Sequence, residues 1–186
     1  MKIDIRRMTK IDIDCVLKIQ DLCYNDSLLE SYETFQSILN QHCYIAELCG
    51  QAIGYLLSHP WNDDEKPPVL NTSIIDFTGN TIYLHDLAVH PTYRQHNIGT
   101  RLYEEFERNV KGYEKITLVA VNNSADMFWK MKGFVPYDSC HLSSYGNNAV
   151  YMKKTIVFLD PLSCTNKEFL TSMWKNKSAF NKCNDG

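Results

Sequence analysis

The sequence has no apolar run close to the roughly 20 residues that a membrane-spanning helix needs. Its first residues, MKIDIRRMTKIDID, lack the apolar centre of a signal peptide. Positive charge is not in excess either, because 19 Lys and Arg residues stand against 22 Asp and Glu residues, and the net charge is -3. Such a balance does not draw a protein to nucleic acid or to anionic lipid. These absences predict a cytoplasmic protein that binds neither nucleic acid nor membranes.

Metal-binding cysteine patterns are absent as well. The chain has seven cysteines, an odd number, and none of them forms a C-x-x-C pair or stands at a spacing from histidine that suits zinc. We expect free thiols in a reducing compartment, some of them as small core residues. The sequence therefore predicts no metal site.

The chain does have enough apolar sequence for one sizeable core, because 44% of its 186 residues are hydrophobic. Apolar residues recur with a helical period in some segments and a strand period in others. We expect strands at 2–8, 43–48, 52–59, 82–89 and 114–121, two more within 135–158, and helices at 9–24, 27–41, 98–111 and 122–134. This alternation indicates an α/β protein.

The residue pattern of the last part of the chain differs from that of the rest. We therefore divide the sequence into a domain over 1–157 and a C-terminal tail over 158–186. In the tail, Thr165 and Glu168 form a capping-box pattern ahead of apolar residues at helical spacing. The pattern predicts a short helix that docks on the domain or on a second subunit. We expect a monomer or a homodimer.

The segment HPTYRQHNIGTRLYEEF, residues 90–106, follows an apolar strand and is typical of a tight turn that leads into a helix. The first N–H groups of a helix are free and carry partial positive charge, so such a turn can hold a phosphate. Arg94 and His96 add side-chain donors there. Gly99 allows close approach of a ligand to the backbone, and Thr100 offers a hydroxyl. The alternative is an ordinary strand-to-helix connection with solvated charges.

The order of residues in this segment resembles the acyl-CoA diphosphate loop of the GNAT (GCN5-related) N-acetyltransferase superfamily. That loop has the pattern Q/R-x-x-G-x-G/A, in which Arg94 takes the first position and Gly99 the last. Asn97 stands in place of the inner glycine. After glycine, asparagine best tolerates a left-handed backbone, so we expect the turn to survive.

Three other segments resemble the same superfamily in the expected order. Residues 3–20 look like its first strand and helix, and residues 48–57 resemble its central hairpin. Residues 122–134 are similar to the segment that flanks the thiol end of acyl-CoA. The resemblance covers about 1–157 and implies the GNAT acyl-CoA N-acyltransferase fold. That fold is a mixed, mostly antiparallel central sheet of about seven strands flanked by about four helices, here with a C-terminal helical tail.

The arylalkylamine (serotonin) N-acetyltransferase branch is similar in two further features. It has a tryptophan-containing excursion before its central strand, matched here by Trp61 in HPWNDDEK. It also has a run H-x-H-x-L-A-V-H, matched by YLHDLAVH from Tyr83. The second histidine of that run falls on His85, whereas Tyr83 takes the place of the first. The resemblance favours this branch and leaves the amine open.

Acetyl transfer from a thioester to an amine needs a base, because the amine arrives protonated near neutral pH. His85 is the candidate base, since imidazole ordinarily changes charge in that range and strand alternation places it on the same face as Tyr83. The alternative is a core histidine bonded to a neighbouring strand. Asp86 points to the opposite face of a regular strand, but the bulge that the superfamily carries near here would turn it. It is the second candidate, as a base or as a residue that orients His85.

The resemblance also implies a set of residues that bind acetyl-CoA, the co-substrate. They lie on the strand, in the loop and helix start that follow it, and in the segment 122–134. Asn122 and Asn123 have an equally plausible role as helix caps. The expected acetyl-CoA contacts are Leu87, Ala88, Val89, Arg94, Gln95, His96, Asn97, Ile98, Gly99, Thr100, Asn122, Asn123 and Trp129.

Trp129 stands where the superfamily often has a tyrosine that protonates the CoA thiolate. An indole N–H has no useful acidity at neutral pH. Three alternatives follow: water or another tyrosine (Tyr137, Tyr145 or Tyr151) supplies the proton, the thiolate leaves unassisted, or the domain binds acyl-CoA without turnover.

The leading hypothesis is an acetyl-CoA-dependent N-acetyltransferase that moves the acetyl group directly to the primary amine of a small molecule, of the arylalkylamine or polyamine type. The long polar excursion over 62–80, with aromatic Tyr24, Tyr32 and Phe35, favours closure over something small. The alternatives are a protein N-terminal or lysine N-acetyltransferase and a catalytically weak acyl-CoA-binding regulatory module.

Overall fold

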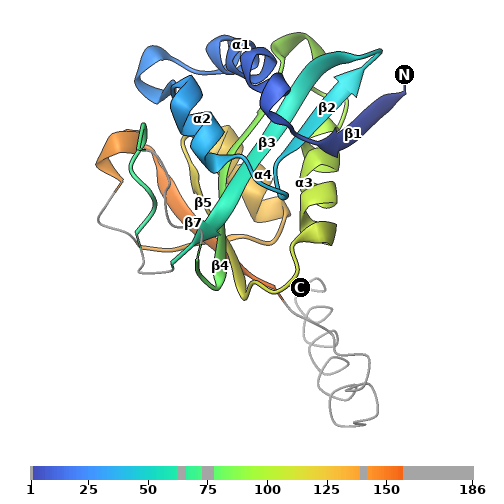
Figure 1. Cartoon of the computed structure of the whole chain (residues 1–186). Helices are drawn as coiled ribbons and strands as arrows, with labels where there is room; N and C mark the ends of the chain where they lie inside the picture. Colours follow the sequence, from blue (N-terminus) through green and yellow to red (C-terminus); the bar gives the residue numbers. More distant parts are fainter. Residues whose placement is uncertain (1, 63–65, 73–77, 139–141, 157–186) are drawn as a thin grey trace, which may run out of the picture. The chain divides into compact units, whose positions relative to one another are not determined.

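A seven-stranded sheet in the order β1-β2-β3-β4-β5-β7-β6 forms the centre of the structure (Figure 1). It is seen in a computed structural model that describes residues 2–62, 66–72, 78–138 and 142–156. The strands are β1 (Ile3–Arg7), β2 (Tyr44–Leu48), β3 (Gln51–Trp61), β4 (Thr81–Val89), β5 (Lys115–Ala120), β6 (Val135–Pro136) and β7 (Val150–Thr155). The α-helices of the described residues are α1 (Ile13–Cys23), α2 (Tyr32–Ile38), α3 (Ile98–Asn109) and α4 (Asn123–Met131). The expected mixed, mostly antiparallel sheet with flanking helices is confirmed.

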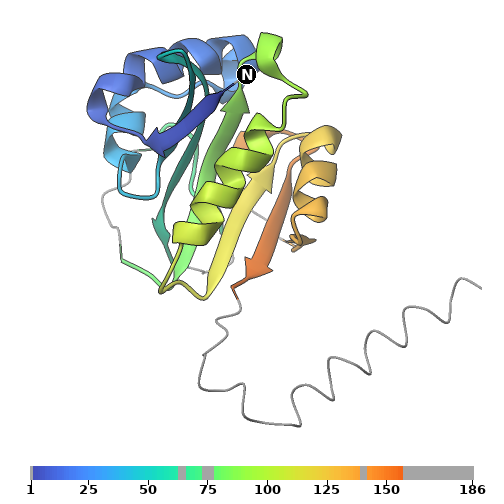
Figure 2. The same cartoon turned by 90° about the vertical axis from the view of Figure 1, so that its right-hand side faces the viewer.

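The helices cover both faces of the sheet. Helices α1 and α2 lie on one face and α3 and α4 on the other (Figures 1 and 2). Helix α3 buries Ile98, Leu102 and Phe106 at the four-residue spacing seen in the sequence. Helix α1 buries Val16 and Ile19 in a separate cluster. The sheet is therefore the shared wall of two apolar cores.

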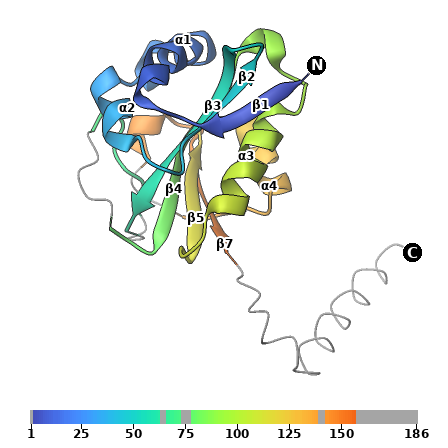
Figure 3. The same ribbon diagram turned by 45° about the vertical axis from the view of Figure 1, so that its right-hand side comes forward.

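Strands β4 and β5 run parallel but pair over only three residues of β4, from Thr81 to Tyr83 (Figure 3). Beyond Tyr83, β4 continues to Val89 and stays paired with β3 on its other side. The two central strands thus separate toward their C-terminal ends. This separation makes room for a ligand within the sheet.

The helix expected over 27–41 is shorter than the sequence suggested. It begins at Tyr32, because Ser31 Oγ caps it by accepting the N–H of Thr34 at 3.2 Å. The residues before it form a separate 3₁₀ turn, η2 (Asp26–Leu28). The expectation of one continuous helix here was wrong, and the change leaves a loop between η2 and α2 at the edge of the site.

The C-terminal third also departs in part from expectation. Two antiparallel strands occur within 135–158, but β6 has only two residues and the connection to β7 includes the 3₁₀ turn η4 (Ser143–Tyr145). The tail over 158–186 lies outside the described residues, so its helix stays a prediction. In the part of the chain that the structure describes, no helix has the length and apolar character to cross a membrane.

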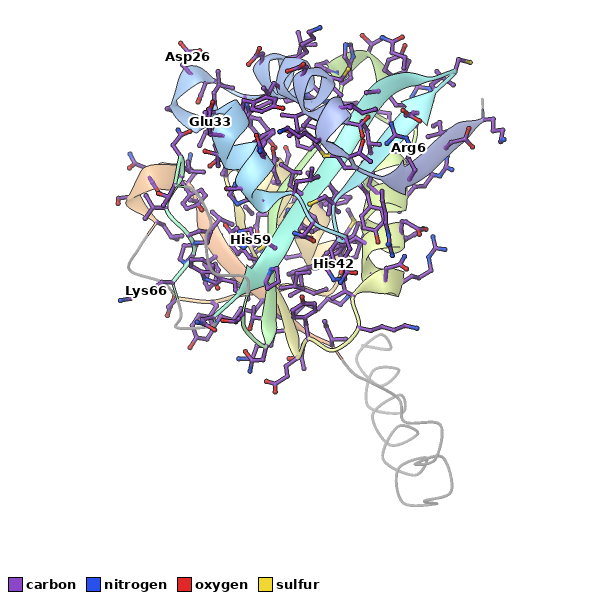
Figure 4. All side chains as sticks on the ribbon, in the orientation of Figure 1. Arg6, Asp26, Glu33, His42, His59 and Lys66 are labelled. Carbon is purple, nitrogen blue, oxygen red and sulfur yellow. The ribbon has the colours of Figure 1, made fainter. Side chains whose placement is uncertain are left out.

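Arg6 ties the start of α1 to the edge of the sheet (Figure 4). Its guanidinium donates to both carboxylate oxygens of Asp12, at 2.9 and 2.7 Å, and to both of Glu47, at 3.1 and 2.7 Å. Asp12 also accepts the N–H and hydroxyl of Thr9, each at 2.8 Å. The hydrogen bond from Arg6 outweighs burial and lowers the pKa of Asp12 to about 2. These bonds fix α1, whose C-terminal end reaches the site described below.

Replacing Asp12 by asparagine should make stability less dependent on pH. Because the pKa of Asp12 is lower in the folded chain than the ordinary 3.8, its carboxylate stabilises the fold above about pH 4 and loses this effect as pH falls through about 2. We expect Asp12→Asn to lower the free energy of unfolding by about 1–2 kcal/mol at neutral pH, with the gap closing in acid. Urea unfolding across pH tests this, with exposed Asp14→Asn as the control. An equal loss at all pH values would contradict it.

Candidate active site

Two adjoining cavities lie where β4 and β5 separate. The inner cavity has a volume of about 90 Å³, and its wall includes Glu30, Leu84, His85, Asp86, Leu118 and Tyr145. The outer groove has a volume of about 420 Å³, and its wall includes Ala88, Val89, Arg94, Gly99, Asn122 and Phe128. A further set lines both and is called the junction: Tyr24, Leu87, Val121, Ala125 and Trp129. The two cavities thus adjoin along these shared residues, and together they are called the channel.

A bulge in β4 sets the direction of the side chains at the inner cavity. Leu57 pairs with Asp86 and Ser58 with Leu84, which leaves His85 as the extra residue between them. The bulge expected from the resemblance is therefore present. It places His85 and Asp86, which are consecutive in sequence, in the wall of the same cavity.

His85 is paired with Glu30, a residue of the loop between η2 and α2. Its Nε2 donates to Glu30 Oε2, and the two side chains are only 2% and 4% exposed. Burial raises the pKa of Glu30, but the hydrogen bond and charge of His85 and the N–H of Asn71 lower it, and the net shift is downward. Glu30 is therefore an ionised partner that can stabilise an imidazolium at His85.

Asp86 is not the partner of His85. Its two carboxylate oxygens accept the hydroxyls of Tyr24, from the end of α1, and Tyr55, from β3. Burial raises the pKa of Asp86, although the two tyrosine hydrogen bonds act in the opposite direction. The expectation that Asp86 orients His85 is thus wrong, because the bulge directs it to the two tyrosines. Asp86 stays a candidate for proton transfer.

His59 on β3 lies beside His85, with ring centroids 5.5 Å apart (labelled in Figure 4). Its Nδ1 donates to the carbonyl oxygen of Pro60 at 2.9 Å, and Trp61 packs edge-on against its ring. Burial, with the nearby charge of His85, lowers the pKa of His59 to about 3. His59 is therefore neutral near pH 7 and places no positive charge next to His85.

The tyrosines considered from the sequence take different positions. Tyr83 is 1% exposed, and its hydroxyl lies 3.2 Å from that of Tyr145. Tyr145 lines the inner cavity, but its hydroxyl donates to the carbonyl oxygen of Pro68. The described residues that line the channel do not include Tyr83, Tyr137 or Tyr151. Tyr83 thus packs edge-on against His85, with ring centroids 5.9 Å apart, but does not line the inner cavity.

The N-terminus of α3 offers three N–H groups without an intrahelical partner. The first helical bond runs from the N–H of Arg101 to the carbonyl oxygen of Asn97, at 3.0 Å, so Ile98, Gly99 and Thr100 precede it. Asn97 is the N-cap and has a φ of 57°. The turn therefore keeps the left-handed residue that the glycine pattern requires. Such a helix start suits a phosphate group.

The outer groove continues to this helix start. Arg94 lines the groove, and its Nε donates to the carbonyl oxygen of Val89 at 3.2 Å. Gly99 also lines it, and a Cβ added there would lie 3.3 Å from Leu87. Arg94 and Gly99 thus stand at the positions expected for a diphosphate site, with the guanidinium on the exposed side.

Several expected acetyl-CoA contacts offer mainly their backbone. The side chains of Ala88 and Ile98 are buried in the cores. Gln95 is exposed with a φ of 68°. His96 is exposed, but its Nδ1 donates to the carbonyl oxygen of Arg94 at 2.9 Å. Any role in binding for these four residues therefore rests chiefly on the shape of the loop.

The start of α4 forms the opposite wall of the groove. Asn122 Oδ1 caps the helix by accepting the N–H of Ala125 at 2.9 Å, so Asn122 and not Asn123 or Ser124 is the cap. The side chain of Asn123 lies outside the described structure. Trp129 is 6% exposed and belongs to the junction. Trp129 thus lines the wall where the two cavities adjoin.

The sequence did not identify Glu30 as a site residue. The signal it offered was weak: a glutamate between Leu29 and Ser31, just before a helix cap. Its partner His85 is 55 positions away in the sequence. In the described ranges, the structure shows no cluster of three or more His, Cys, Asp or Glu residues that could hold a metal ion.

Substitutions at Asn97 should separate backbone shape from side-chain chemistry. Glycine adopts the observed φ of 57° without strain, so Asn97→Gly should preserve or tighten CoA binding. Asn97→Ala should weaken it by about 5- to 30-fold, because alanine costs roughly 1–2 kcal/mol in a left-handed conformation. Titration calorimetry with CoA tests both. Marked weakening in Asn97→Gly would count against this loop geometry.

Solved structures with the same fold cover most of the chain at low sequence identity. The loading GNATL domain of CurA from Lyngbya majuscula has a TM-score of 0.68 at 14% identity, over 83% of this chain and 98% of that one. The ribosomal-protein-S18-alanine N-acetyltransferase from Escherichia coli has a TM-score of 0.62 at 17% identity, over 86% and 97%. The PaiA N-acetyltransferase from Thermoplasma acidophilum, in complex with coenzyme A, has a TM-score of 0.57 at 17% identity, over 84% and 100%.

A comparison with family models gives a more specific result than these distant structures. The search among curated proteins found no match. The Acetyltransferase (GNAT) family matches residues 13–134, which is more than half of the chain. Together with the fold, this match shows that the chain belongs to the GNAT family of acyl-CoA-dependent acetyltransferases.

Proposed function

We propose that the chain transfers the acetyl group of acetyl-CoA to the primary amine of a small molecule, of the arylalkylamine or polyamine type. The observation that carries the proposal is the buried His85–Glu30 pair in the wall of the inner cavity. That cavity continues into a groove whose helix start and glycine suit CoA. A histidine paired with a carboxylate is suited to accept a proton from an ammonium group.

The pairing also supports a choice between the two ring nitrogens of His85 as the proton acceptor. Nε2 donates to Glu30, whereas the buried Nδ1 has no hydrogen-bond partner among the described residues. Nδ1 is therefore the nitrogen that accepts a proton from the acceptor ammonium, directly or through one water. Glu30 stabilises the resulting imidazolium. The neutral amine then attacks the thioester carbon, the C–N bond forms, and the C–S bond breaks with the electron pair on sulfur.

The small inner cavity favours a small acceptor. Its volume of about 90 Å³ is far below the roughly 300–1,000 Å³ of common ligand pockets, so it suits the amine end of a small substrate. The wall above it is bound in place: Asn71 donates its N–H to Glu30 at 2.8 Å and its side-chain amide to the carbonyl oxygen of Leu29 at 2.9 Å. These bonds join the excursion after β3 to the loop before α2. An extended peptide would need this closure to open.

A protein acceptor is the second candidate because a protein of the same fold is named a ribosomal-protein-S18-alanine N-acetyltransferase. Release of thiol from acetyl-CoA should therefore be measured with arylalkylamines, diamines, N-terminal peptides and lysine peptides. We expect turnover with one of the small amines. Turnover with peptides alone would contradict the small-molecule proposal. CoA binding without any turnover would favour a regulatory module.

The charge of Glu30 should matter for rate more than for acetyl-CoA binding. Glu30→Gln keeps the shape but removes the charge opposite His85, so we expect kcat to fall by about 10- to 100-fold, with acetyl-CoA affinity within a factor of about two. His85→Ala should abolish turnover with the same affinity. Glu33→Gln, an exposed residue on α2 (labelled in Figure 4), is the matched control. Equal rates in Glu30→Gln and Glu33→Gln would rule out this role.

A further inference from the structure

The position of the reacting sulfur follows from the channel, given the proposed function. The phosphates of CoA belong at the start of α3, at one end of the outer groove. The acceptor amine belongs beside His85 in the inner cavity. Because the thioester must reach the amine, the sulfur lies between these two ends. The junction residues, which line both cavities, therefore surround it.

Tyr24 is the one side chain of the described junction that carries a hydroxyl. Burial and the neighbouring Asp86 raise the pKa of Tyr24 well above its ordinary value, so its proton has to be replaced as it leaves. The other members are Leu87, Val121, Ala125 and Trp129. Aliphatic side chains and an indole cannot protonate a thiolate at neutral pH. Tyr24 is the C-cap of α1, which lies on the opposite face of the sheet from α4 (Figures 1 and 2). It thus supplies a phenol where Trp129 leaves none.

Asp86 connects Tyr24 to a second tyrosine. The hydroxyl of Tyr24 bonds Asp86 Oδ1, and that of Tyr55 bonds Oδ2. Both oxygens accept, which is the arrangement of the ionised carboxylate. When Asp86 carries a proton, that proton can bond the oxygen of Tyr24, and the hydroxyl of Tyr24 is then free to turn to the sulfur. Burial favours this protonated form by raising the pKa of Asp86.

We propose that Tyr24 is the catalytic acid that protonates the CoA thiolate, and that Asp86 acts through it as a positioning residue and proton source. As the C–S bond breaks, sulfur takes the phenolic proton of Tyr24, and Tyr24 takes the proton of Asp86. Tyr24 ends neutral and Asp86 ends ionised, with the two hydroxyl bonds seen in the structure. Of the two protons that the acceptor ammonium loses, one restores Asp86 and the other leaves to solvent.

Titratable and charged groups face Asp86 and Tyr24 from each element packed against them. His85 and Glu30 face Asp86 from the inner cavity, and Tyr55 faces it from β3. Cys23 and Arg94 face Tyr24 from the outer groove. Asp86 is therefore surrounded by one carboxylate, one imidazole and two phenols. Each of these groups contributes to the pH dependence of kcat.

The test compares Tyr24→Phe with Tyr55→Phe, since each removes one hydroxyl bond to the same carboxylate. Tyr55 is absent from the described walls of the channel. We expect Tyr24→Phe to lower kcat by about 10- to 100-fold, with CoA affinity and melting temperature close to those of the wild type. Tyr55→Phe should lower kcat only a few-fold. The fall of kcat that accompanies deprotonation of Asp86 as pH rises should be lost in Tyr24→Phe.

A double variant tests whether the two groups act as a unit. If Asp86 works through Tyr24, Tyr24→Phe combined with Asp86→Asn should be no slower than the slower single variant. Equal losses in Tyr24→Phe and Tyr55→Phe, or multiplied losses in the double variant, would overturn the relay while leaving the proposed function standing. Absence of wild-type turnover with every amine and peptide would overturn both.

Discussion

The separation of β4 from β5 is the constraint on which the rest of the site depends. The two strands pair over three positions and then part, although both are central in the sheet. Buried backbone groups need partners, and a strand edge left open inside a protein is suited to a ligand that carries amides of its own. The pantetheine arm of CoA has such amides. The helix starts of α3 and α4 stand on either side of this opening.

The bulge in β4 then divides two adjacent residues between different environments. His85 faces a carboxylate held by a backbone N–H, whereas Asp86 faces two phenols. Environment, more than residue type, decides which titratable group takes a proton and which gives one. A single inserted residue in one strand thus places two titratable side chains with different partners in the wall of one cavity.

Much of the fold could be predicted from the sequence because its signals are local. Hydrophobic spacing identified α3 and β4, and the left-handed tolerance of asparagine correctly anticipated the backbone at Asn97. The partners at the site could not be predicted in this way. Glu30 and Tyr24 meet their β4 partners across 55 and 62 positions of sequence, through tertiary packing and a bulge. No periodicity in the sequence encodes such contacts. The start of α2 was missed for a related reason, because the apolar pattern continues through its cap.

The hydrogen bond from Asn71 to Glu30 has a consequence for discrimination between acceptors. The same carboxylate that holds the excursion over the cavity also pairs with His85. Under the proposed mechanism, an oversized acceptor that displaces Asn71 removes one of the two hydrogen bonds of the Glu30 carboxylate, and so disturbs the partner of the base. Glu30 then takes part both in the selection of acceptors by size and in the pairing with His85. An acceptor that fits poorly would then react slowly even when it binds well.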